Sequence, residues 1–226
     1  MRLSRVVFLI MMILWVPASL AGERTEVHLF QYGRTNTDML KTAFLDFRDM
    51  LGEKLPRLSA ELSREINIPA LSHLKLKSVM DGSGALLRPE ARVGSLDAKR
   101  QYWLQTGALS VLTGHVRQQK ETPYVFTTFF WGNLRGPYSN EMITLKLPVD
   151  GESFDNTYDS HSVAVLYALA QETKHDCVNS VEIIRLLSEA QKRARAISID
   201  LPDLAAELEG IVVTAIDEIR SECSEK

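Results

Sequence analysis

Asp159, Ser160 and His161 together supply the side-chain types of nucleophilic catalysis. A Ser-His-Asp triad is assembled from positions that are separated in the chain, because the histidine must face both of its partners, and three adjacent residues point in different directions. Ser160 also lacks the flanking glycines of a nucleophile elbow. We expect Asp159 or Ser160 to act as the N-cap of a helix instead, and we assign no catalytic residue.

A second group of candidate ligands consists of His175, Asp176 and Cys177, with His115 and His161 elsewhere in the chain. Zinc sites use pairs of cysteine or histidine at short, repeated spacings, and this sequence contains no such pair. We therefore predict neither a metal site nor a cofactor.

Residues 1 to 21 have the organisation of an export signal. Arg2 and Arg5 precede the apolar run 6 to 16, and small residues follow up to Ala21. Since the apolar run is shorter than the roughly 20 residues that span a bilayer, we expect cleavage after residue 21 rather than an uncleaved anchor and no stable membrane insertion afterwards. Cleavage would change the net charge from −3 to −5, because the segment holds two arginines and no acidic residue. Such a domain has no electrostatic footprint for nucleic acid.

Export also bears on the two cysteines, Cys177 and Cys223. In an oxidising compartment an isolated pair usually closes a disulfide, which we predict here. The alternative is two inert thiols that are buried separately.

The stretch around residues 108 to 149 predicts three consecutive strands, of which 124 to 131 is rich in aromatic residues on both faces. One interpretation is a central strand covered on both sides. The other leaves Tyr124, Trp131 and Tyr138 at an exposed rim as a partner-binding surface, because amphipathic aromatic residues are favoured interface anchors.

The elements that would position these residues follow from periodicity. Strands are expected over 26 to 32, 74 to 79, 109 to 117, 124 to 131 and 142 to 149, with helices over 38 to 66 and 96 to 106 and three more after residue 159. Pro56 lies inside the long helix, where a kink or a brief break is expected, and we favour a kink. The predicted fold is α/β (α+β): a mixed sheet of about five strands with a long kinked helix and a shorter helix over residues 22 to 150. A C-terminal three-helix segment, 151 to 226, is expected to dock on it.

Part of the chain resembles the exported α/β domain at the amino terminus of TolB and in CsgG-like secretion proteins. The resemblance lies in the segment EVHLFQY, which leads into the helix from Asp38, and in ALSVLTGHVRQQ followed by PYVFTTFFWGNL. In those modules a strand ending in a small residue and glycine, here Thr113 and Gly114, precedes a strand carrying aromatic residues. The resemblance covers about residues 26 to 150. It implies a noncatalytic, protein-binding role in the cell envelope.

We therefore predict a noncatalytic periplasmic accessory or scaffold protein of a Gram-negative bacterium that binds another envelope protein. One alternative is a small-molecule or glycan-binding protein that uses Tyr124, Trp131 and Tyr138 for stacking. A further alternative is a hydrolase, which would require His161, a carboxylate and a nucleophile within hydrogen-bond reach.

Overall fold

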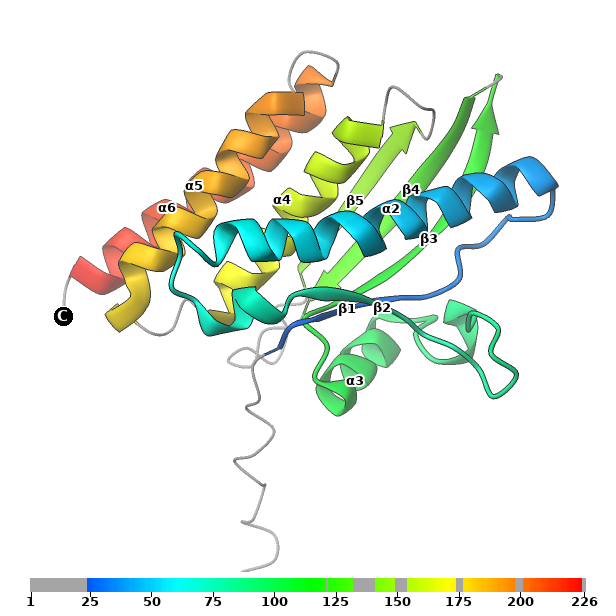
Figure 1. Cartoon of the computed structure of the whole chain (residues 1–226), viewed down its shortest axis with the longest axis horizontal. Helices are drawn as coiled ribbons and strands as arrows, with labels where there is room; N and C mark the ends of the chain where they lie inside the picture. Colours follow the sequence, from blue (N-terminus) through cyan, green and yellow to red (C-terminus); the bar gives the residue numbers. More distant parts are fainter. Residues whose placement is uncertain are drawn as a thin grey trace, which may run out of the picture.

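The computed structural model describes residues 24–120, 122–131, 141–148, 154–173, 177–197 and 201–224. Its strands are β1 (Glu26–Leu29), β2 (Lys75–Ser78), β3 (Ser110–Gln119), β4 (Thr122–Trp131) and β5 (Glu141–Pro148). Its α-helices are α2 (Asp38–Leu62), α3 (Leu96–Thr106), α4 (Phe154–Thr173), α5 (Ser180–Ala196) and α6 (Pro202–Ser224), with short 3-10 turns between some of them. The α/β class, with a mixed sheet, is confirmed (Figure 1).

The strands are ordered β2-β1-β3-β4-β5. Strand β1 is parallel to both of its neighbours, whereas β3, β4 and β5 form an antiparallel meander. Strand β2 lies at an edge, and its alternating lysines are exposed there, as suits an edge strand. Lys77 and Lys75 contact the carboxylate of Glu26 at 2.7 and 3.1 Å, and the hydrogen bond from Lys77 does most to lower the pKa of Glu26 to about 2.

The β3–β4 hairpin depends on Gly114. A Cβ atom placed there would lie 2.1 Å from the carbonyl oxygen of Phe126 and 2.9 Å from the Tyr32 ring. Because real Cβ atoms do not approach other atoms so closely, only glycine lets the two strands and the tyrosine pack at this point.

Helix α2 begins where the Thr37 hydroxyl accepts a hydrogen bond from the Leu40 backbone N–H at 3.3 Å. It continues without interruption past Pro56, so the alternative of a break there is wrong. Its apolar stripe packs on the face of the sheet that carries Val27, Leu29 and the inward residues of β3 and β4.

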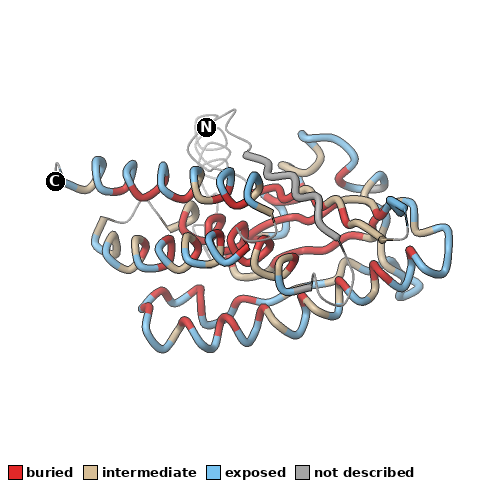
Figure 2. The backbone as a smooth tube through the Cα atoms, turned by 90° about the horizontal axis from the view of Figure 1, so that it is seen from above, coloured by how far each residue is buried: buried red, intermediate tan, exposed pale blue. Residues whose placement is uncertain are grey.

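Helix α4 runs through the interior of the molecule. Every residue from 160 to 170 is buried, since the sheet and α2 lie against one side of the helix and α5 and α6 pack against it from the other. Figure 1 shows α5 and α6 side by side beyond α4, and Figure 2 shows the buried backbone (red) running through the middle of the molecule. Helices α4, α5 and α6 thus share one hydrophobic core with the sheet. The first C-terminal helix, expected only after residue 159, begins earlier, at Phe154.

Helix α3 covers part of the opposite face of the sheet. The Ser95 hydroxyl caps its start and Gly107 ends it with φ 67°, and its bounds, Leu96–Thr106, are those predicted. Its Tyr102 and Trp103 pack against Phe30, Val111 and Phe130 in a second, smaller core. The two faces of the central strands are therefore covered by different helices.

Arg24, at the start of the described residues, contacts both α3 and α4. Its side chain is 6% exposed and donates to the carbonyl oxygens of Trp103 and Ala108, both at 2.9 Å. The guanidinium lies 3.5 Å from the Trp103 ring centroid and pairs with Glu172 of α4 at 3.1 Å. Arg24 thus joins α3 to α4 across one end of the sheet.

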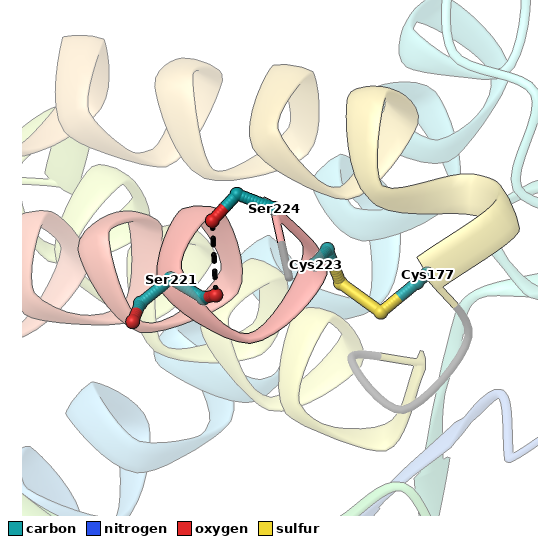
Figure 3. The surroundings of a disulfide bond; sticks show 4 residues. All are labelled: Cys177, Ser221, Cys223 and Ser224. Atoms are coloured by element: carbon teal, nitrogen blue, oxygen red, sulfur yellow. Dashed lines mark hydrogen bonds between the residues drawn. A yellow bond between two sulfur atoms is a disulfide. The ribbon is translucent and has the colours of Figure 1, made fainter. Parts of the chain in front are cut away.

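Cys177 and Cys223 are joined by a disulfide, as predicted (Figure 3). The bond links the turn before α5 to the last turn of α6, so it closes these two helices into a loop. Among the helices that the structure describes, none combines the length and the apolar character needed to cross a membrane.

Candidate functional site: a cationic groove beside an open sheet face

A groove of about 590 Å³ lies at the carboxyl end of β1. One wall is the connection from β1 to α2, residues 31 to 36, and the other wall is residues 88 to 90, on the way from β2 to α3. This volume falls within the range of small-molecule sites in proteins.

The topology of the sheet places the groove there. The chain leaving β1 turns to the face covered by α2, whereas the chain leaving the adjacent parallel strand β2 turns to the face covered by α3. Neighbouring connections that diverge in this way open a crevice beyond the carboxyl ends of the strands, which is the general position of ligand sites in open α/β sheets.

Backbone hydrogen bonds hold both walls against the sheet. The Gln31 N–H donates to the Leu87 carbonyl at 3.0 Å, and the Gly33 N–H donates to the Gly114 carbonyl at 2.9 Å. Arg34 follows directly with φ 63°, a left-handed conformation that non-glycine residues adopt rarely and at a cost in free energy. The groove is therefore built into the backbone and does not require a mobile side chain to form it.

The charges of the groove are not compensated internally. Arg34 and Arg88 are both exposed, and within the described ranges of the chain neither has a carboxylate at ion-pair distance. Glu90 lies on the same wall as Arg88 and likewise forms no ion pair with a described residue. Two cations and one anion thus face a common solvent-filled space.

The sheet face next to the groove is only partly covered. Helix α3 packs near Phe130, and farther along the same face His115 and Phe126 stack with ring centroids 4.6 Å apart and planes 9° from parallel. The Arg117 guanidinium lies 5.6 Å from the Phe126 ring centroid. Tyr124 and Phe126 remain partly exposed, so aromatic and cationic groups meet at this open face.

His115 connects the open face to the groove. It forms an isolated parallel β-bridge with Gly33. Its Nε2 atom is buried without a hydrogen-bond partner among the described residues. Burial lowers the pKa of His115, and the charges of Arg117 and Arg34 lower it further. Arg34 of the groove and Arg117 of the open face thus both act electrostatically on this one side chain.

The three aromatic residues predicted to form a partner-binding rim do not lie together at a surface. Trp131 is 4% exposed and packs edge-to-face against Tyr167 of α4, with ring centroids 5.3 Å apart. Its expected position at an exposed rim is wrong, because α4 covers that end of β4. Tyr124 is partly exposed on the opposite face, and Tyr138 lies outside the described residues.

The residues with triad chemistry are also placed differently from the prediction. Asp159 and Ser160 lie inside α4 and neither is its N-cap. The Ser160 hydroxyl donates to the Asn156 carbonyl at 2.6 Å, and Asp159 pairs with Arg193 of α5 at 3.0 Å. Since neither side chain is bonded to His161, they do not form a triad.

His161 instead belongs to a buried hydrogen-bond chain. Its Nδ1–H donates to the Thr157 carbonyl at 2.7 Å, so Nε2 of the neutral ring accepts from the Thr127 hydroxyl at 3.0 Å. The Tyr32 hydroxyl in turn donates to Thr127 at 2.8 Å. The ring is fully buried beside Phe47, and this burial lowers the pKa of His161 to about 4. The chain is a structural link between sheet and helices, with no access for substrate.

Within the described part of the chain, no group of three or more histidine, cysteine or acidic residues could hold a metal ion. His115 and His161 lie on opposite faces of the sheet, since one stacks on Phe126 and the other bonds to Thr127. Their side chains therefore cannot serve one site.

No protein family, curated protein or solved structure matches this chain. The candidate site therefore rests on geometry and charge. Sequence reasoning missed Arg34 and Arg88, and it considered His115 only as a possible metal ligand. A signal was present for Arg34, which follows Gly33 at the end of the first predicted strand, where sites in α/β proteins gather.

Proposed function

We propose that the protein is a noncatalytic, exported accessory or scaffold protein that binds another cell-envelope protein. The observation that carries this proposal is the open sheet face formed by His115, Arg117, Tyr124 and Phe126. Tyrosine and arginine are enriched at the energetically dominant positions of protein interfaces, and a flat strand surface offers them a rigid support.

The charge of this face indicates the chemistry of the partner. In a chain whose net charge is negative, Arg117, Arg34 and Arg88 gather along one face and its border. A partner surface that is acidic and carries apolar groups would complement both the cations and the rings.

Export and a periplasmic location belong to the same proposal. The disulfide supports an oxidising compartment, and the leader-like residues 1 to 21 support secretion with cleavage after Ala21. The resemblance of residues 26 to 150 to the amino-terminal module of TolB supports an envelope role of the same class.

The test is affinity capture from envelope extract with tagged residues 22 to 226, followed by mass spectrometry. We expect the unmodified protein to retain one envelope protein stoichiometrically, and Arg117→Glu or Tyr124→Ala to lose at least 90% of it. Both side chains are at least partly exposed, so the melting temperature should remain within a few degrees of the parent value.

Arg64→Glu is the matched control. Arg64 is exposed just beyond the far end of α2, about 37 Å along the helix from the end that borders the groove. This charge reversal should leave capture unchanged. Equal loss with Arg64→Glu would show a nonspecific charge effect, and retention by both open-face variants would refute the assignment of the binding surface.

A further inference from the structure

The groove between residues 31 to 36 and 88 to 90 has two arginines among its lining residues. We infer that it binds a small molecule bearing an oxyanion, a carboxylate or a phosphate group, held between Arg34 and Arg88. This inference does not depend on the open face or on any protein partner.

The two arginines are supplied by opposite walls. Arg34 belongs to the connection after β1 and Arg88 to the segment before α3, and both line the same space of about 590 Å³. The planar guanidinium group offers paired N–H donors that match the two oxygens of a carboxylate or phosphate. A ligand between the walls can therefore receive donors from both sides at once.

The end of α2 adds to the attraction for an anion. Asn36 lines the groove, and the Thr37 side chain caps the Leu40 N–H. The earliest N–H groups of a helix have no partner within the helix, and they place partial positive charge at its start. The carboxylate of Asp38, in the first turn of α2, offsets part of this positive charge.

The other residues that line the groove would favour one orientation of the ligand. Gln31, Thr35 and Asn36 supply hydrogen-bonding groups, and Glu90 supplies one negative charge. An anion with a second negative group next to Glu90 would be repelled, whereas an ammonium or hydroxyl group there would be favoured. We therefore expect a compact ligand with its oxyanion at the arginines and a donor group directed to Glu90.

The experiment follows the arginine side-chain Nε–Hε signals of the disulfide-bonded protein by NMR. Succinate, inorganic phosphate and glutamate are titrated separately, with sodium chloride at matched ionic strength as reference. We expect saturable shifts of the Arg34 and Arg88 signals with at least one of the first three. The relative response to succinate and phosphate identifies the oxyanion, and a stronger response to glutamate supports the role of Glu90.

Two variants and one control locate the site. Arg34→Gln and Arg88→Gln should each weaken binding about tenfold or more, since a charge-assisted hydrogen bond is lost, while Arg64→Gln should have no effect. Melting temperatures check that all three variants remain folded, which their exposure predicts.

Shifts that grow linearly without saturation, or that sodium chloride reproduces, would overturn the inference. Binding that survives both groove variants would overturn it too. None of these readouts involves the protein partner, so a negative result here is distinct from a failure of the capture experiment.

Discussion

Acidification should destabilise the fold through His161. This imidazole is fully buried between the sheet and α4, and it is neutral because its Nδ1–H faces the Thr157 carbonyl while Nε2 accepts from Thr127. Protonation would place a second N–H against the Thr127 hydroxyl, which already accepts from Tyr32, and would leave a charge in an apolar surrounding.

The size of the effect follows from the pKa. Burial lowers the pKa of His161 to about 4 in the folded protein, from 6.5 in the unfolded chain. Because the unfolded chain binds the proton more readily, stability is complete above pH 6.5 and falls as the pH drops towards 4, below which this contribution levels off. One pKa unit corresponds to about 1.4 kcal/mol, so His161 should account for roughly 3 kcal/mol of lost stability.

The assay is urea unfolding at a series of pH values from 8 to 4, for the unmodified protein and for His161→Gln. Glutamine does not titrate, so the difference between the two free energies of unfolding isolates His161 from all other ionisable groups. We expect this difference to shrink by roughly 3 kcal/mol as the pH falls. An NMR titration of the His161 ring should give the folded-state pKa directly.

Thr127→Val provides the matched control. It removes the hydrogen bond to Nε2 and leaves the Tyr32 hydroxyl unpaired, which should cost about 1 to 3 kcal/mol at pH 7. It keeps His161 buried, and burial is the main cause of the lowered pKa, so the acid sensitivity should persist. Parallel pH profiles for the unmodified protein and His161→Gln would refute the reasoning.

Four further changes test the packing. Gly114→Ala should prevent the β3–β4 hairpin from closing and should abolish the cooperative thermal transition. In the same melting experiment Gly210→Ala, at a position in α6 with no atom nearby, should raise the free energy of unfolding by about 0.5 to 1 kcal/mol. Replacing Cys177 and Cys223 by serine should cost up to about 4 kcal/mol in urea unfolding, as expected for a closed loop with a sequence separation of 46, and an unchanged midpoint would contradict this. Arg24→Ala should cost about 3 to 5 kcal/mol because its carboxylate partner on α4 loses its counter-charge, and calorimetry should detect the lower melting temperature.

Local sequence determined most of the elements. Ser95 and Gly107 defined the ends of α3 because capping and a left-handed terminator are properties of a few adjacent residues. The alternation of leucine and lysine is a local pattern typical of a strand like β2 with one solvent-exposed face, and the pair Cys177 and Cys223 predicted the disulfide. Periodicity also separated the sheet-forming region from the helical end of the chain. These features depend on short-range sterics or on the chemistry of single residue types.

The start of α4 illustrates where local reasoning failed. The largely polar stretch from Phe154 to Asp159 does not indicate a helix, yet it is helical because it continues into residues 160 to 170, which tertiary packing buries completely. Asp159 is stabilised there by Arg193 of α5, although burial raises the pKa of Asp159. Such a partner, 34 residues away, leaves no local pattern in the sequence.

Tertiary structure alone decided the candidate site. Both faces of β4 carry aromatic residues, so sequence pattern could not tell which face a helix would cover; α4 covers Trp131, while Tyr124 stays partly exposed. The groove joins Arg34 to Arg88, which lie in different connections and meet only because β1 and β2 are adjacent and parallel. The sequence pattern of a segment predicts whether it forms a helix or a strand and which of its faces are apolar. Which residues become buried or come close together depends on how the elements pack on one another, and that is decided by the whole molecule.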